Sequence, residues 1–246
     1  KSLARQQGGH RTAPLGAGHE VHSAQATWER RAWAVTLATP RGAITTRLHI
    51  AGRHNVTNAL AATACTLAAG APVAAIAQGL RDFTPVKGRS RAFSVSVAGR
   101  DITVVDDTYN ANPDSMHAAI QVLAELPGPQ LLVMGDMGEV GDQGPQFHAE
   151  AGALAREAGI PTMFALGAQS VHAVSAYGDG AGHFTDMSAL QDAVRNVLPA
   201  VGSVLVKGSR FMKMEQVVEA ISASALPTEQ QQKPINPREG HHGATH

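Results

Sequence analysis

The chain has 246 residues, 43% hydrophobic and 16% charged, and a formal net charge of +0. This composition is typical of a folded protein with a substantial core. The charge is not strongly basic, which argues against a protein that binds nucleic acid or a membrane surface. The single cysteine, Cys65, excludes an internal disulfide, and no apolar run has the length of a membrane span. We therefore expect a cytoplasmic monomer that binds no nucleic acid, does not enter a membrane and holds no structural metal.

The first third of the chain predicts a hairpin and two helices. Apolar residues alternate with polar ones between 33 and 50, around a turn at 40–42. Helical spacing follows over 55–69 and again over 72–83. The segment 84–88 breaks this pattern and is the expected domain boundary.

Strands and helices alternate beyond that boundary. This pattern predicts right-handed crossovers and a doubly wound, mostly parallel sheet whose strand-end loops share one rim. Residues 1–20 show no period and are expected to form a loop, whereas 227–246 has too few apolar residues to pack and is expected to be disordered. We expect strands at 93–97, 102–105, 131–134, 162–166 and 203–206, and helices from Pro113, at 146–158, near Ser170, at 188–198 and at 212–223.

The segment 104–116 passes from an apolar strand through a polar loop into a helix. Such loops are where open α/β sheets collect their ligands. Asp107 could accept hydrogen bonds from sugar hydroxyls. Asn110 and Asn112 could form hydrogen bonds with an amide or a base, and the ring of Tyr109 could stack on a planar group. The alternative is an Asx-rich turn that only caps the helix.

The order Asp-Thr-Tyr-Asn-Ala-Asn-Pro-Asp-Ser-Met at 107–116 resembles the loop that opens the C-terminal domain of the Mur ligase family. Three further stretches agree in order and spacing: Gly-Arg-His-Asn-Val-Thr-Asn at 52–58, Gly-Asp-Met-Gly-Glu at 135–139 and Lys-Gly-Ser-Arg at 207–210. The Tyr-Asn-Ala-Asn core of this loop most resembles the same loop in the family members that add D-alanyl-D-alanine to UDP-MurNAc-tripeptide. The resemblance covers about 21–221.

This resemblance implies two domains and an ATP site. Residues 1–88 would be the rear part of the central ATPase domain, and 89–226 a Rossmann-like C-terminal domain. Asn55 and Asn58 share a helix face, and a plain helix cap by His54 or Asn55 would not require the second asparagine. Arg89 would reach the ATP phosphates, although Ser90 follows it where the family usually has an apolar residue. The residues assigned to ATP are His54, Asn55, Asn58, Arg89, Asp107, Asn110 and Asn112.

The resemblance also implies a substrate site. Asp136 or Glu139 would face the amine of the dipeptide, with a Gly-rich turn carrying solvated acids as the alternative. Lys207 and Arg210, with backbone amides at a helix start, would bind a substrate carboxylate, so Lys207→Ala should mainly raise the requirement for D-alanyl-D-alanine. His148 is expected on a helix surface. The expected substrate-binding residues are Tyr109, Asp136, Glu139, Lys207, Ser209 and Arg210, and the expected catalytic residues are Arg89 and Lys207.

The reaction implied is ATP-dependent amide-bond formation through an acyl phosphate, with Mg²⁺ as the second cofactor. It requires a phosphate-cradling Gly-x-x-Gly-Lys-Thr/Ser loop, which these 246 residues lack. We expect that loop and most Mg²⁺ ligands upstream, so that the chain is a fragment and inactive alone. Alternatives are another Mur or folylpolyglutamate-synthetase-type ligase, or a non-catalytic nucleotide-binding module.

Overall fold

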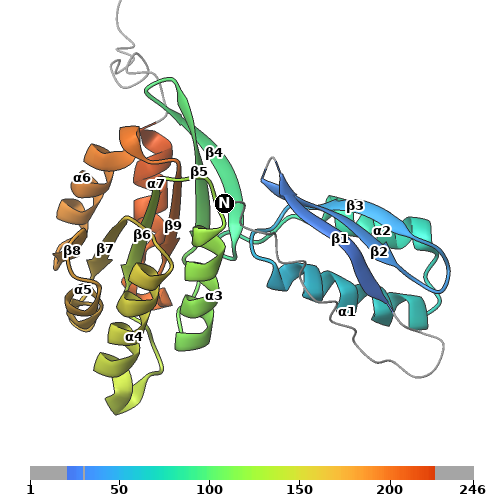
Figure 1. The fold of residues 1–246 in the computed structure, drawn as a ribbon, viewed down its shortest axis with the longest axis horizontal. Coiled ribbons are helices and arrows are strands. Elements are labelled where there is room, and N and C mark those ends of the chain that lie inside the picture. Colours follow the sequence, from blue (N-terminus) through green and yellow to red (C-terminus); the bar gives the residue numbers. More distant parts are fainter. Residues whose placement is uncertain (1–20, 30, 225–246) are drawn as a thin grey trace, which may run out of the picture.

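A computed structural model describes residues 21–29 and 31–224, and the chain forms two parts joined by a short segment (Figure 1). The expected loop at 1–20 and the expected tail at 227–246 lie outside the described residues. Within the described ranges, no helix is both long and apolar enough to cross a bilayer.

The first part is a small antiparallel sheet covered by two helices. Strands β1 (His22–Glu29), β2 (Ala32–Ala38) and β3 (Ile44–Leu48) pair in that order. Helices α1 (His54–Ala68) and α2 (Val73–Asp82) complete this part, and their apolar sides share one core with the sheet. Sequence reasoning missed β1 although Ala24, Ala26 and Trp28 alternate with polar residues, because two of these three are alanines, which are weak strand formers.

The second part contains a six-stranded sheet in the order β4-β5-β9-β6-β7-β8. Only β4 runs antiparallel to its neighbour, so the predicted mostly parallel α/β sheet is confirmed. The strand missed here, β8, has four residues including a glycine, too few for a periodic signal. The elements are β4 (Arg91–Val97), β5 (Arg100–Asp107), α3 (Pro113–Ala124), β6 (Gln130–Gly135), α4 (Gly144–Glu157), β7 (Thr162–Leu166), α5 (Val171–Tyr177), β8 (Ala181–Phe184), α6 (Met187–Val197), β9 (Ser203–Lys207) and α7 (Glu215–Ala223).

Helices cover both faces of this sheet. Val105 and Leu205 belong to the core under α3, α4 and α5, whereas Val104 and Val206 belong to the core under α6 and α7. Because neighbouring residues of one strand are buried on opposite faces, the inner strands are almost entirely apolar. Polar side chains therefore collect at the strand ends.

The segment 83–90, which joins the two parts, is attached to the end of β5. Gly88 donates its N–H to Asp106 Oδ2 over 3.0 Å, and Ser90 donates its N–H to Asp107 Oδ1 over 2.9 Å. The Gly88 carbonyl accepts from the Tyr109 N–H over 2.9 Å. A side chain at Gly88 would meet that same N–H at 3.0 Å, and its φ of +82° already favours glycine. These contacts hold the first part beside the carboxyl end of β5.

Candidate functional site

A cavity of ≈ 600 Å³ lies where the two parts meet, at the carboxyl ends of β5 and β9. Its volume is in the range of small-molecule sites. Apolar side chains from α3 and the sheet form one side, including Val105, Val122 and Leu205, and Ile50 joins them from the first part. Of the residues predicted to act in a site, the cavity brings together His54, Asn55, Arg89, Asp107, Tyr109, Asn110, Asn112 and Lys207. It is not lined by Asn58, Asp136, Glu139, Ser209 or Arg210.

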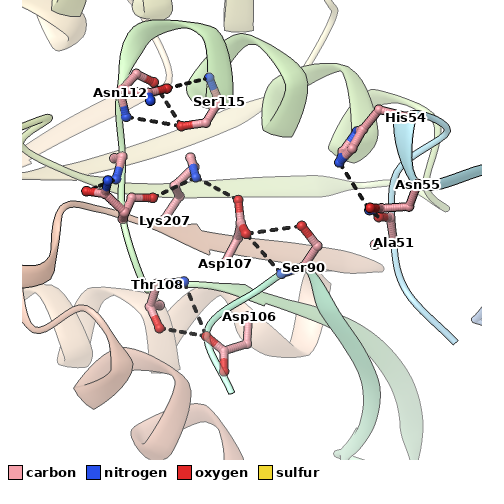
Figure 2. Close-up of polar contacts among 12 residues, drawn as sticks. Ala51, His54, Asn55, Ser90, Asp106, Asp107, Thr108, Asn112, Ser115 and Lys207 are labelled. Atoms are coloured by element: carbon pink, nitrogen blue, oxygen red, sulfur yellow. Dashed lines mark hydrogen bonds and ion pairs between the residues drawn. The ribbon is translucent and has the colours of Figure 1, made fainter. Parts of the chain in front are cut away.

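Asp107 and Lys207 form an ion pair in the wall of this cavity (Figure 2). They are register partners at the ends of the parallel strands β5 and β9, and the ammonium lies 2.7 Å from Asp107 Oδ2. Lys207 also donates to the Asn110 carbonyl over 2.8 Å. Lys207 is only 2% exposed, so it is a buried cation whose charge is balanced by Asp107.

The arrangement at 207–210 differs from the anion site expected at a helix start, whereas the substrate-binding role of these residues stays a prediction. Lys207 and Arg210 do not converge, because the Arg210 guanidinium is largely exposed and lies 3.3 Å from Glu215. The segment does not begin an α-helix either. Residues Arg210–Met212 form a 3₁₀ turn, Lys213 adopts a left-handed φ of 51°, and α7 begins only at Glu215.

The start of α1 supplies His54 and Asn55 to the cavity. The residue before the helix, Arg53, makes no side-chain cap, and Asn55 donates to the Ala51 carbonyl over 2.6 Å. Asn58 donates to Asn55 Oδ1 over 3.0 Å, as expected for residues on one helix face. The capping alternative therefore does not hold for His54 or Asn55. Asn58 instead orients Asn55 from outside the cavity.

His54 is held as a neutral ring. Asn55 Nδ2, which can only donate, lies 3.1 Å from His54 Nε2, so this nitrogen accepts. Desolvation by burial lowers the pKa of His54 below its usual 6.5. The Asp107 carboxylate raises this pKa by a smaller amount, and the Lys207 ammonium lowers it further. The cavity thus presents an uncharged imidazole at this position.

Arg89 and Tyr109 lie together at the mouth of the cavity. The Arg89 guanidinium carbon is 4.0 Å from the centroid of the Tyr109 ring, and both side chains are exposed. Stacking uses the face of the guanidinium, which leaves its N–H edge available to an anion. Tyr109 therefore supports Arg89 in this structure.

Asn110 and Asn112 line the cavity and also form hydrogen bonds within their own loop. Asn112 caps α3, because its Oδ1 accepts from the Ser115 N–H over 2.9 Å and its own N–H donates to Ser115 Oγ over 3.0 Å (Figure 2). Asn110 Oδ1 accepts from the next N–H, that of Ala111, over 2.9 Å. The turn alternative is thus present, and it orders the loop that carries Asp107 and Tyr109.

Asp136 is bonded within the fold and does not line the cavity, and its expected contact with the substrate amine stays a prediction. Its carboxylate accepts from the Gln169 N–H at 3.1 Å to each oxygen and from the Ser170 N–H at 2.8 Å. The residue is 7% exposed, and a side chain at Gly167 would collide with it. Asp136 therefore fastens the loop before α5. Glu139 is exposed with a left-handed φ of 58°, away from the cavity.

The expectation for His148 is corrected, since it is fully buried rather than on a helix surface. Its Nε2 accepts from the Met137 N–H over 2.9 Å, so Nδ1 carries the proton and donates to the Gly144 carbonyl over 2.7 Å. A signal was present in the sequence: His148 lies on the same helical stripe as Gly144, Ala151 and Ala155, all buried on α4.

Sequence reasoning missed two residues that shape the site. Ser90 donates both its N–H and its hydroxyl to Asp107 Oδ1, at 2.9 and 3.1 Å. Asp106 is 1% exposed and accepts from Gly88 and from the Thr108 hydroxyl. Two adjacent acids at the end of a buried strand were the available signal, since a buried carboxylate needs several donors.

The donor set fits a nucleotide better than a magnesium ion. An apolar side, amides from asparagine, a carboxylate and an exposed guanidinium match a base, a ribose and phosphates. In the described part of the chain no three His, Cys, Asp or Glu side chains come together as a metal site. Asp107 is already bound to the Lys207 ammonium, so these residues do not form a Mg²⁺ site.

Comparison with known proteins agrees with this arrangement. The Mur ligase family, by its glutamate ligase domain, matches residues 88–210. The UDP-N-acetylmuramoyl-tripeptide–D-alanyl-D-alanine ligase of Escherichia coli K12 is 43% identical over 188 residues, covering 76% of this chain and 41% of the relative. MurF from Acinetobacter baumannii superposes with a TM-score of 0.73 at 33% identity, covering 85% of this chain and 46% of that one.

A more distant structure, MurF from Thermotoga maritima in complex with ADP, shares the fold with a TM-score of 0.70 at 19% identity, covering 86% of this chain and 47% of that one. The chain thus spans less than half the length of these relatives. Its fold, its four ordered motifs and the matched domain agree, and the chain belongs to the Mur ligase family.

Proposed function

We propose that this chain is part of an ATP-dependent ligase that joins D-alanyl-D-alanine to UDP-MurNAc-tripeptide, and that the cavity binds the nucleotide. The observation that carries the proposal is the convergence of an apolar side, neutral His54, Asp107 and the edge of Arg89 in one cavity. The name of the Escherichia coli relative supports the choice of substrates. A cytoplasmic monomer is the proposed state, and an exposed free Cys65 suits a reducing compartment.

The proposed division of the chain follows the two folded parts. Residues 1–88 would be the rear of the ATPase domain, and 89–226 the C-terminal domain. The attachment of Gly88 and Ser90 to β5 supports this boundary, because the cavity then contains residues from both sides of it. Neither part provides the complete set of polar side chains alone.

Each group of the nucleotide has a proposed partner. The base would lie against the apolar side near His54 and Asn55, and the ribose would bind Asp107. Arg89 would meet the phosphates through its N–H edge. The substrate carboxylate would accept the γ-phosphoryl group of ATP and form an acyl phosphate, which releases ADP. The amine of the dipeptide would then displace phosphate and form the amide. Arg89 would stabilise negative charge on the phosphates during that transfer.

The first test is calorimetric titration of ADP into this chain. We expect measurable binding, weakened about tenfold in Asp107→Asn, which corresponds to one hydrogen bond to a charged group. Asp101→Asn is the matched control, because Asp101 is exposed near the start of the same strand, β5, and does not line the cavity. Absence of ADP binding by the unaltered chain would refute the nucleotide assignment.

The ligation itself is tested on a longer polypeptide that carries this chain together with a phosphate-binding loop. With UDP-MurNAc-tripeptide and Mg²⁺ present, ADP release should depend on D-alanyl-D-alanine. Release driven by a different amine would contradict the proposed substrate. ADP binding without any turnover would favour a nucleotide-binding module.

A further inference from the structure

Lys207 is buried and already paired, which is unusual for a lysine expected to bind a substrate anion. We propose that Lys207 is a positioning residue for the nucleotide and acts through Asp107 instead of contacting the dipeptide. This inference rests on the proposed nucleotide site and assigns a different role to the Lys-Gly-Ser-Arg motif.

The geometry leaves Lys207 little freedom. All five residues of β9 are buried, and Lys207 is the last of them. Its ammonium spans two neighbours, Asp107 Oδ2 at 2.7 Å and the Asn110 carbonyl at 2.8 Å. Lys207 therefore fixes the Asp107 carboxylate and the turn that follows it at the same time.

The acceptor positions of Asp107 are nearly filled. Oδ1 takes the N–H and the hydroxyl of Ser90, and Oδ2 takes the ammonium of Lys207. A carboxylate has about four acceptor positions, so one remains, on Oδ2. Its side chain is 18% exposed and lines the cavity. Asp107 is thus clamped from two sides with one position left for one ribose hydroxyl.

Removing Lys207 would undo that clamp from one side. Oδ2 would be left without the ammonium that donates to it, and the partly buried carboxylate would be left without its counter-charge. The Asn110 carbonyl would be deprived of its donor as well, which loosens the loop carrying Tyr109. The nucleotide would be deprived specifically of its hydrogen bond to Asp107, so the weakening should depend on a ribose hydroxyl.

The experiment compares ADP with 2′-deoxy-ADP and 3′-deoxy-ADP by calorimetric titration of this chain. The unaltered chain should prefer ADP about tenfold over one of the two analogues, as expected for a hydrogen bond to a charged group. Lys207→Met should weaken ADP about tenfold and that analogue at most about twofold, which abolishes the preference. Lys213→Met is the matched control, since Lys213 is exposed and does not line the cavity.

A double variant separates positioning from a general structural role. In an Asp107→Asn background, Lys207→Met should cause no further loss of ADP affinity, because both changes remove the same hydrogen bond to the ribose. This pair also serves if Lys207→Met alone does not fold, since replacing both partners leaves no unpaired buried charge. Additive losses in the double variant would overturn the proposal.

The remaining outcomes are distinguishable. Equal weakening of ADP and both analogues by Lys207→Met would overturn the inference and indicate a structural role. Unchanged ADP affinity with a raised KM for D-alanyl-D-alanine in the ligation assay would overturn it in favour of direct contact with the dipeptide. If the unaltered chain bound no ADP, the nucleotide site would fail together with the inference.

Discussion

Replacing Asp136 by asparagine tests whether this acid supports the fold or a substrate. The carboxylate accepts two backbone N–H groups, from Gln169 and Ser170, at 2.8 to 3.1 Å in a site that is 7% exposed. Asparagine keeps an oxygen at the Oδ1 position, which accepts from Ser170, whereas its amide N–H₂ in place of Oδ2 would oppose the Gln169 N–H, which reaches both oxygens. A hydrogen bond to a charged group contributes about 1.5–3 kcal/mol, so losing one and weakening the other should cost about 2–4 kcal/mol of the free energy of unfolding.

That loss is large against the roughly 5–15 kcal/mol by which a folded domain is stable. For a chain of this size it should lower the Tm by roughly 4–16 °C. Differential scanning calorimetry measures the change, and Asp142→Asn is the matched control because Asp142 is exposed on the same connection. ADP affinity should stay unchanged, since Asp136 does not line the cavity.

The reasoning would be refuted by the opposite pattern. If Asp136→Asn left the Tm within a degree or so of the control while raising the KM for D-alanyl-D-alanine, the carboxylate would be a substrate contact. The hydrogen bonds to Gln169 and Ser170 would then have little importance for stability.

Three further predictions concern packing, capping and pH. Gly152→Ala should destabilise by about 1–3 kcal/mol, because its new methyl would collide with the backbone of Ala173, whose carbonyl carbon lies 2.7 Å away. Gly79→Ala, with nothing within 4 Å, should stabilise by up to about 1 kcal/mol; urea unfolding of both variants checks the opposite signs. Asn112→Ala should cost about 1 kcal/mol through loss of the α3 cap, again by urea unfolding, and an unchanged stability would contradict the capping box. His54 should titrate below 6.5 by NMR. As the pH falls, His54 gains its proton in the unfolded chain before it does so in the folded protein. The stability due to neutral His54 is therefore present above pH 6.5 and decreases as the pH drops toward the pKa of His54 in the folded protein. His54→Gln should flatten this decrease.

Local patterns were enough to predict most elements. The apolar runs of β5, β6 and β9 and the helical spacing of α1 and α3 depend on neighbours in the chain. The loop between β5 and α3 was predictable for the same reason, because short polar side chains bond to the backbone next to them. Motif order then indicated which loops belong to one site.

The site also contains contacts that no local pattern can indicate. Asp107 and Lys207 lie 100 positions apart in the chain, and they pair because β9 inserts beside β5 in the sheet. The same insertion buries Lys207 and separates it from Arg210, which sequence reasoning had grouped with it. Charge and spacing were visible in the sequence, whereas burial and partner were not.

Asp136 and His148 show the same division. The sequence suggested a substrate contact for Asp136 and a helix-surface position for His148, but folding places backbone N–H groups against both side chains. A polar side chain is free for a ligand only if the fold leaves its hydrogen bonds unmade. The sequence by itself determined the family, the α/β alternation and the loops that could carry a site. Strand order and packing, which bring distant residues together, decided which polar groups line the cavity and which support the fold.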